Sequence, residues 1–576
     1  MANSKSKDIL LTLTAFSASA LMLTVIQVPF RGGSLAWIAL VPFILICRPQ
    51  ASLWRLMWIS CLVSFVYWTA NLYWIGLVTI PAQIAFSISL ALYWPVLALG
   101  VRFVRRKGPG WLTLAVPLLF VGAEAWQGIV YTGFGWRLLA HSQWMHLPVI
   151  QISDIFGQLG VSFVIALVNG FVAELIIAAN SKRLHGVHLG KGAAVAAVLA
   201  ATVIYGYHRL AETPEHLTPG PMLGSVQTNI PSNVKEASES GDGILTDLLR
   251  MSNACFEAGA EIVAWPETIV LSSLNQDYVS LCREDSRPRV YHQAIAEHTR
   301  DKGYVLLGAH SVSLEFRDYE YVVTDRFNSA FLYTPGGKQD GRYDKIHLVP
   351  FGEYIPFSES LPLLHKLIIK LSPYDYDYNL TKGTEYTVFE TNALSRPCRF
   401  GVLICYEDTD PTVARKMVVA DGAKKAGLLV NISNDGWYVR WKDNKVLPSV
   451  ELPQRTVIAA FRAIENRVGI LRSVNTGISC LIDSTGRIRN SFENGTLPSR
   501  AMDRQGVEGW FTDRIELDDR VTLFSRHGRV LDLACGFAVS LIVLWAIAAG
   551  IAERQTGKQS QREVRAATSV SKKAKF

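Results

Sequence analysis

The sequence predicts a polytopic α-helical membrane domain of about eight spans joined to a separate α/β domain. Three observations carry this prediction. The 576-residue chain is 49% hydrophobic, and this content is unevenly distributed along it. Most of the apolar residues lie in residues 1–207 and in one stretch near the C-terminus. Between them, short apolar segments alternate with charged, helix-like segments, which is typical of a layered globular domain.

Eight apolar stretches are long enough, or nearly long enough, to cross a bilayer. They lie near residues 9–29, 34–47, 53–75, 81–104, 111–131, 159–179, 190–207 and 530–551. The second is short, so we expect it to be tilted or paired with the first as a hairpin. The boundaries predict an N-terminal transmembrane domain over residues 1–207 with about seven spans, and a final span over residues 530–552.

Basic residues mark alternate loops and therefore predict the orientation. One set of loops and termini holds Lys5, Lys7, Arg48, Arg55, Arg102, Arg105, Arg106, Lys107, Lys182, Arg183, Lys191 and the basic tail 553–576. The opposite loops hold far fewer, among them Arg31 and Arg137. By the positive-inside rule the tail is cytoplasmic, and residues 208–529 lie on the periplasmic side of a bacterial cytoplasmic membrane. The net charge of +8 forms no basic-aromatic surface, so nucleic acid is not expected as a partner.

The segment over residues 208–529 reads as alternating strands and helices. Apolar runs ended by polar turns predict strands near residues 222–230, 260–267, 304–311, 326–333, 400–407, 427–435 and 468–477, and residues 452–465 read as a helix. There is no GxGxxG fingerprint or Gly-rich phosphate loop, and the eight cysteines include no CxxC pair, so we expect no cofactor and no metal. Cys255 and Cys282 could pair if their domain is extracytoplasmic. The tyrosine-rich excursion at 355–380 could form a lid.

Three predicted strand ends or turns carry reactive groups. Glu267 ends AWPE, Lys345 lies in RYDKIHLVPFGEYIP, and Cys405 lies in GVLICYED. A free thiol is mostly protonated at neutral pH, so a nucleophilic cysteine needs a base or a cation beside it. Glu267 could take the thiol proton, and Lys345 could stabilise the oxyanion of a tetrahedral intermediate. Glu353 and Glu407 could orient the lysine or the base.

Taken singly, these residues have ordinary alternatives. A cysteine in an apolar strand is usually part of the core, a glutamate after Trp-Pro can cap a helix, and a loop lysine is normally solvated. A Cys/His pair has less support, because His347 lies only two residues from Lys345. Spacing alone therefore leaves the site undecided.

The combination of motifs is more specific than its parts. The Glu of WPE, the Lys of YDKIHLVPFGEYIP and the Cys of ICYE resemble the Glu-Lys-Cys triad of the nitrilase superfamily, whose fold is an α-β-β-α sandwich. LVPFGEYIP together with SNDGW, RAIENR and SVNTGIS is similar to one membrane-embedded branch, the apolipoprotein N-acyltransferases. YTGFGWRLLAHSQ (Tyr131–Gln143) and VQTNIP (Val226–Pro231) resemble the same branch, so the likeness covers almost the whole chain.

The resemblance implies a ping-pong acyl transfer. A phospholipid would acylate Cys405, and the α-amine of a diacylglyceryl-cysteine lipoprotein would then take the acyl chain from the thioester. Glu267 would serve as general base and acid and Lys345 as oxyanion stabiliser. Glu353 would support the lysine, while Tyr406 and Glu407 would line the pocket.

The sequence departs from this pattern at three places. It has GFGW at Gly133–Trp136 where the branch more often has GFPW, a longer stretch between Trp437 and Gln454, and Arg455 where a histidine is common. These put substrate docking at that loop in doubt. The triad also leaves open a membrane-anchored nitrilase-type amidase in which water resolves the thioester, and a catalytically idle assembly partner.

Overall fold

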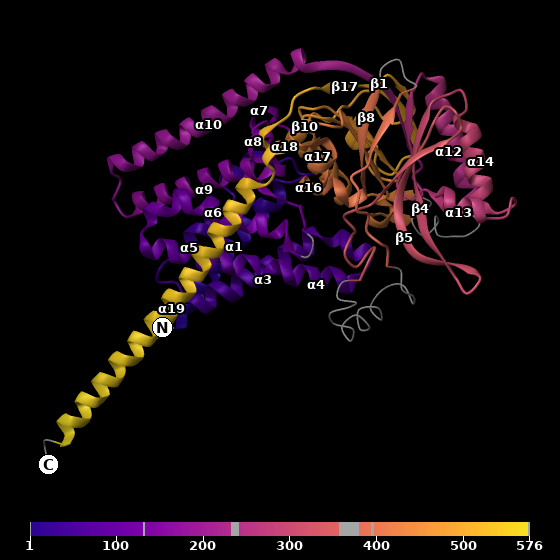
Figure 1. The fold of residues 1–576 in the computed structure, drawn as a ribbon. Coiled ribbons are helices and arrows are strands. Elements are labelled where there is room, and N and C mark those ends of the chain that lie inside the picture. The colour runs from indigo at the N-terminus through magenta and orange to yellow at the C-terminus, as the bar shows by residue number, and fades with distance from the viewer. Residues whose placement is uncertain are drawn as a thin grey trace.

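The computed structural model describes residues 2–130, 133–231, 241–355, 379–392, 397–443 and 445–573. A bundle of helices lies beside a β-sandwich. The N-terminus lies at the end of the bundle away from the sandwich, and the C-terminal helix begins near the sandwich, runs along the bundle and extends beyond that far end (Figure 1). The excursion predicted at 355–380 falls almost wholly outside the described residues.

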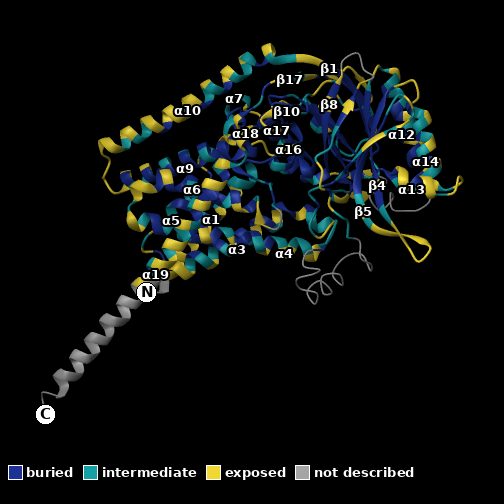
Figure 2. Ribbon diagram, in the orientation of Figure 1, coloured by how far each residue is buried: buried dark blue, intermediate teal, exposed yellow. Residues whose placement is uncertain are grey.

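Within the described residues, seven helical segments are long and apolar enough to cross a membrane. They are α1 (Ala2–Val25), α3 (Leu53–Asn71), α4 with α5 (Ile80–Ala91 and Tyr93–Lys107), α6 (Leu112–Gln127), α9 (Gln158–Asn180), α10 (Gly186–Glu212) and the start of α19 (Val530–Lys573). Their apolar surfaces are widely exposed, as expected for helices that face lipid (Figure 2). The protein is therefore a multi-pass membrane protein.

The second apolar stretch, residues 34–47, is short in the structure, as expected from the sequence. This stretch forms only a 3-10 turn, Gly33–Trp37, and the short helix α2 (Val41–Ile46). Pro29 and the Gly32-Gly33 pair lie between the end of α1 and α2 and favour a break there, because proline lacks the N–H that helical bonding needs and glycine favours turns.

The broken segment nevertheless returns across the bundle. Arg55, at the start of α3, pairs with Asp8 of α1 at 2.9 Å. At the other end, Asn71 Nδ2 donates to Thr24 Oγ1 at 3.0 Å. The helices α1 and α3 therefore run in the same direction, and the chain between them must come back over about 24 Å, the length of sixteen helical residues.

The basic residues of the predicted cytoplasmic loops gather at the end of the bundle away from the sandwich. Arg102 and Arg105 donate to carbonyl oxygens of Ala51 and Ile44. Lys191 Nζ, near the start of α10, donates to the carbonyl oxygen of Gly110 at 2.5 Å and so joins α10 to the connection that follows α5. The basic residues that mark alternate loops in the sequence therefore lie at one end of the helical bundle.

The sandwich consists of two facing sheets. The larger has the order β16-β17-β1-β2-β4-β5-β6, with β3 paired to β4, and the smaller has the order β15-β14-β11-β8-β7. The larger comprises β1 (Leu217–Gln227), β2 (Ile262–Ala264), β3 (Val270–Ser273), β4 (Tyr304–Arg317), β5 (Glu320–Tyr333), β6 (Gln339–Asp344), β16 (Asn494–Gly495) and β17 (Gly509–Asp518). The smaller comprises β7 (Val388–Thr391), β8 (Cys398–Ile404), β11 (Leu428–Ser433), β14 (Gly469–Val474) and β15 (Cys480–Ile482).

Helices complete the four layers. The helices α12 (Gly241–Glu257) and α14 (Arg287–Thr299) cover the larger sheet, whereas α16 (Pro411–Val418) and α17 (Glu451–Asn466) cover the smaller one on the side of the bundle (Figure 1). One core, which includes Leu223, Ile262, Phe400 and Val402, lies between the sheets. The predicted α-β-β-α sandwich is confirmed, and each of the seven predicted strands contributes to it.

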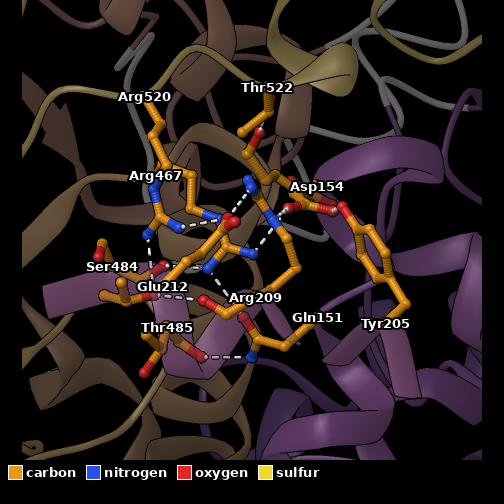
Figure 3. A network of polar contacts seen from close by, with 12 residues as sticks. Gln151, Asp154, Tyr205, Arg209, Glu212, Arg467, Ser484, Thr485, Arg520 and Thr522 are labelled. Atoms are coloured by element: carbon orange, nitrogen blue, oxygen red, sulfur yellow. Dashed lines mark hydrogen bonds and ion pairs between the residues drawn. The ribbon is translucent and has the colours of Figure 1, made fainter. Parts of the chain in front are cut away.

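A buried polar network joins the bundle to the sandwich (Figure 3). Asp154 accepts from Tyr205 and Arg209 of α10 and from Arg467, the residue that ends α17, all within 2.8 Å. Gln151 bridges the same junction, since it donates to the carbonyl oxygen of Thr485 and accepts from Arg467. These contacts fix α10 and α17 relative to each other.

Candidate active site

The nucleophile candidate lies in a sharp turn at the carboxyl end of β8. Cys405 has a φ of 52°, which is unusual for a residue other than glycine, and opens the 3-10 turn Cys405–Thr409. Ile404 N donates to Glu407 Oε2 at 2.7 Å and holds the turn closed. Cys405 therefore lies in the turn directly beyond the last residue of β8, Ile404, and its side chain is buried there. Strained backbone of this kind is found at functional sites.

Glu267 and Lys345 come together as the sequence predicts. Lys345, directly after β6, places Nζ 3.2 Å from Glu267 Oε1 and 2.9 Å from Glu353 Oε1. Asn434 N, just after β11, donates to Glu267 Oε2 at 2.8 Å. The ends of several strands from both sheets therefore meet at one point, the usual place for a site in parallel sheets.

Sequence reasoning missed Asn328, which lies in β5. Its Nδ2 donates to Glu267 Oε1 at 2.7 Å and to Glu353 Oε1 at 2.9 Å, the same two oxygens that bind Lys345. One amide and one ammonium thus hold both carboxylates in place. The only sequence signal was a polar residue inside an apolar strand, RFNSAFLY, which is too common to single out.

The electrostatics of the site favour a resting thiol beside a charged pair. Burial raises the pKa of Cys405 to about 12, although the Arg455 and Lys345 cations oppose this. Burial would also raise the pKa of Glu267, but Lys345 and hydrogen bonds from Asn328 and Cys405 outweigh it and lower that pKa. Burial would lower the pKa of Lys345, yet the two carboxylates raise it well above its usual value. Glu267 is therefore a carboxylate, ready to accept a proton from the thiol.

Glu407 is placed differently from a pocket-lining residue. Its carboxylate is fully buried and accepts from Tyr343 Oη, Ile346 N and His347 N on one oxygen and from Ile404 N on the other. It joins the loop that carries the lysine to the turn that carries the cysteine. Burial raises its pKa to about 7. Its position is that of a residue that orients the site.

Tyr406 links the catalytic turn to the bundle. Its Oη donates to the carbonyl oxygen of Gly133 at 2.5 Å, and its ring stacks on Trp136 with centroids 5.5 Å apart. Both partners belong to the GFGW loop singled out in the sequence. The wall beside Cys405 is thus built by the membrane domain as well as by the sandwich.

The sequence singled out Arg455, in α17, only as a position where related proteins commonly have a histidine. Its structural role was not predicted. Its guanidinium pairs with Asp408 at 3.1 Å and with Asp435 at 2.7 Å, while Asp408 also binds Arg472 at 2.5 Å. Asp408 lies in the cysteine turn and Asp435 in the SNDGW turn, so α17 ties the two together. Nothing local in the sequence pairs these residues, which lie up to 64 positions apart.

No cluster of metal ligands occurs among the residues that the structure describes. Cys255 and Cys282 are both free thiols, so the pairing left open from the sequence is not formed.

Comparison with known proteins divides the chain in the same way as its fold. Residues 19–171 match the family described as apolipoprotein N-acyltransferase N-terminal domain. Residues 222–510 match the family described as carbon-nitrogen hydrolase.

Curated relatives match over nearly the full length. The apolipoprotein N-acyltransferase of Geobacter metallireducens is 30% identical over 541 residues, covering 91% of this chain and 93% of the relative. The apolipoprotein N-acyltransferase of Chlorobaculum tepidum is 26% identical, covering 89% of this chain and 92% of the relative. Among solved structures, Saccharomyces cerevisiae Nit3, described as a member of branch 10 of the nitrilase superfamily, is 18% identical with a TM-score of 0.33 and covers 55% of this chain and 95% of its own.

Proposed function

This chain belongs to the apolipoprotein N-acyltransferase family, and from that premise we propose that it N-acylates lipoproteins through a thioester on Cys405. The observation that carries the proposal is the meeting of Glu267, Lys345 and Cys405 at one edge of the sandwich. A carboxylate hydrogen-bonded to a thiol, with an ammonium fixed beside them, is the equipment that nucleophilic acyl transfer requires.

In the first half-reaction, Glu267 takes the thiol proton as the sulfur attacks the ester carbonyl of a phospholipid. A C–S bond forms, and Lys345 stabilises the negative charge that develops on the carbonyl oxygen. The ester C–O bond then breaks, and Glu267 returns the proton to the departing alkoxide. The products are the acyl-enzyme and a lysophospholipid.

In the second half-reaction, the neutral α-amine of a diacylated lipoprotein attacks the thioester. Glu267 takes a proton from the amine as the C–N bond forms and the C–S bond breaks. The proton then passes to the departing thiolate, which restores the resting thiol. Glu353 and Asn328 hold Lys345 and Glu267 in position throughout, and Glu407 and Tyr406 hold the turn and its wall.

We place the transmembrane domain at residues 1–207, the catalytic domain at 208–529, the last span at 530–552 and a cytoplasmic tail at 553–576. The gathering of basic residues at the end of the bundle away from the sandwich supports a cytoplasmic location for that end. The catalytic domain would then lie on the periplasmic side of the bacterial cytoplasmic membrane, where lipid donor and lipoprotein acceptor share one leaflet.

Mass spectrometry of the purified protein tests the proposal. With phospholipid alone, the protein should gain one acyl chain on Cys405 and hold it, and a diacylated lipopeptide should discharge it to a triacylated product. The Cys405→Ala variant is the matched control and should gain nothing. An adduct that decays to free fatty acid at a rate unaffected by lipopeptide would instead identify a hydrolase.

A further inference from the structure

A cavity of about 580 Å³ lies between α4, α5, α6 and α19, outside the site described above. It is lined mostly by apolar side chains, and its volume lies in the range of small-molecule sites. Gln127, at the last position of α6, lines it together with Phe134 of the GFGW loop. The cavity therefore lies in the half of the bundle nearer the sandwich.

The sequence explains why helices leave this space. Pro95, near the start of α5, has no N–H to donate to the carbonyl oxygen of Ala91, so α4 and α5 are separated at Leu92. The facing positions are small: Ser89, Ala123 and Ser540 line the cavity. Close packing leaves few apolar spaces of this size empty in proteins, and where such a space is open to a bilayer, hydrocarbon is the material that can fill it.

The cavity also lies at the lipid-facing surface of the bundle. Among its lining residues, Val96 is 41% exposed and Leu544 is 62% exposed. In a membrane these side chains meet hydrocarbon rather than water. An alkyl chain can therefore move sideways from the bilayer into the cavity without crossing a polar layer.

A continuous set of contacts leads from the cavity to the nucleophile. Phe134, in the cavity wall, stacks on Trp136 with centroids 5.1 Å apart, and Trp136 stacks on Tyr406, the neighbour of Cys405. Gln127 Nε2 donates to the carbonyl oxygens of both Phe134 and Trp136 at 2.9 Å and fixes this loop. The loop is thus one wall of the cavity and one wall of the catalytic turn.

We propose that this cavity binds one acyl chain of the phospholipid donor while the ester of the other chain reacts at Cys405. The inference rests on the proposed function and assigns it a substrate site. A diacyl lipid held by one chain keeps its glycerol beside the GFGW loop, where the second ester can reach the thiol. Anchoring through a part of the substrate that does not react is an established source of orientation in catalysis.

Photocrosslinking tests binding separately from chemistry. A phospholipid with a diazirine at the end of one acyl chain is placed in nanodiscs with the Cys405→Ala variant, which cannot react. We expect labelled peptides from α6 and α19. Adding Ala123→Phe or Ser540→Phe, which fill the cavity from two different helices, should reduce this labelling about tenfold or more, because excluding a few methylene groups from an apolar site weakens binding by that order.

The matched control is Ala534→Phe, which adds the same ring to the exposed side of α19 outside the cavity and should leave labelling unchanged. Undiminished labelling in both filled variants would overturn the proposal. The proposal would also be overturned if a photoactivatable diacylated lipopeptide labelled the cavity and the phospholipid did not, because the cavity would then bind the acceptor. Failure of wild-type protein to form a thioester would count against the proposed function and leave this binding result standing.

Discussion

Neutralising Glu267 should convert a pH-independent acylation into one that depends steeply on pH. With a pKa of about 12, Cys405 is a thiolate in only about 10⁻⁴ to 10⁻⁵ of molecules near pH 7.5, since the two values differ by about 4.5. Direct proton transfer to Glu267 at the moment of attack avoids this restriction. In Glu267→Gln the reaction must draw on the pre-existing thiolate, so we expect acylation to slow by on the order of 10²-fold or more at neutral pH.

The pH profile separates loss of the base from general damage. Removing the carboxylate also removes one cause of the raised thiol pKa, but burial, the largest cause, remains. The rate in Glu267→Gln should therefore rise about tenfold per pH unit above neutrality, whereas the wild-type rate stays flat until Glu267 is protonated at low pH. Intact-mass measurement of Cys405 acylation between about pH 6 and pH 10 would record both.

Glu353→Gln is the matched control, because it takes an equal charge from Lys345 and leaves the base in place. The acylation rate of Glu353→Gln should fall, but it should not rise with pH as the rate of Glu267→Gln does. A flat profile in Glu267→Gln, or a wild-type rate, would remove Glu267 from the role of base. The same slope in both variants would show that charge near Lys345, and not proton transfer, governs the rate.

Other outcomes follow from the same geometry. Cys405→Ser should abolish acyl transfer with an unchanged unfolding temperature, because a hydroxyl is far harder to deprotonate than a thiol; measurable transfer would argue against the thioester. Lys345→Ala should lower the acylation rate by about 10²- to 10³-fold through loss of oxyanion stabilisation, measured by the same mass assay. Asp154→Ala leaves the buried Arg467 without its carboxylate and should cost about 3–5 kcal/mol, seen in thermal unfolding in detergent. A membrane-impermeant thiol reagent should label Lys338→Cys from the periplasmic side and Ser181→Cys only after the inner membrane is opened; the reverse pattern would invert the topology.

The sequence was sufficient for the parts that depend on short-range pattern. Apolar runs ended by polar turns located each of the seven strands. Spacing left the site undecided, and the resemblance to the nitrilase triad was what brought Glu267, Lys345 and Cys405 together in the prediction. The uneven distribution of basic residues between the two ends of the bundle could also be predicted, because it follows from the order of the spans and the charges of the loops between them. Residues 34–47 were expected to be a short span, and the structure has there a 3-10 turn and a short helix within the segment that returns across the bundle.

What the sequence could not give was the pairing of distant polar residues. Asn328 and Arg455 look like an ordinary strand amide and an ordinary helix cation until the fold brings their partners to them. For Glu407 the sequence offered two roles, orienting the catalytic residues or lining the pocket, and the tight turn directs its carboxylate to the backbone of the lysine loop. In each case the deciding contact spans dozens of residues or depends on the turn geometry.

The buried charges around α17 show how the two halves of the protein act on one site. Arg455, at the start of this helix, binds Asp408 in the cysteine turn, and Arg462 donates to the carbonyl oxygen of Thr409 at the end of the same turn. Near the end of the helix, Glu465 accepts from Gln158 N at the start of α9. Buried ion pairs add little net stability compared with apolar packing, so stability alone does not account for them. Their effect is geometric, because they hold the Cys405 turn at a fixed position relative to the helices of the bundle. In the proposed mechanism, acyl transfer between two membrane-bound substrates depends on that position.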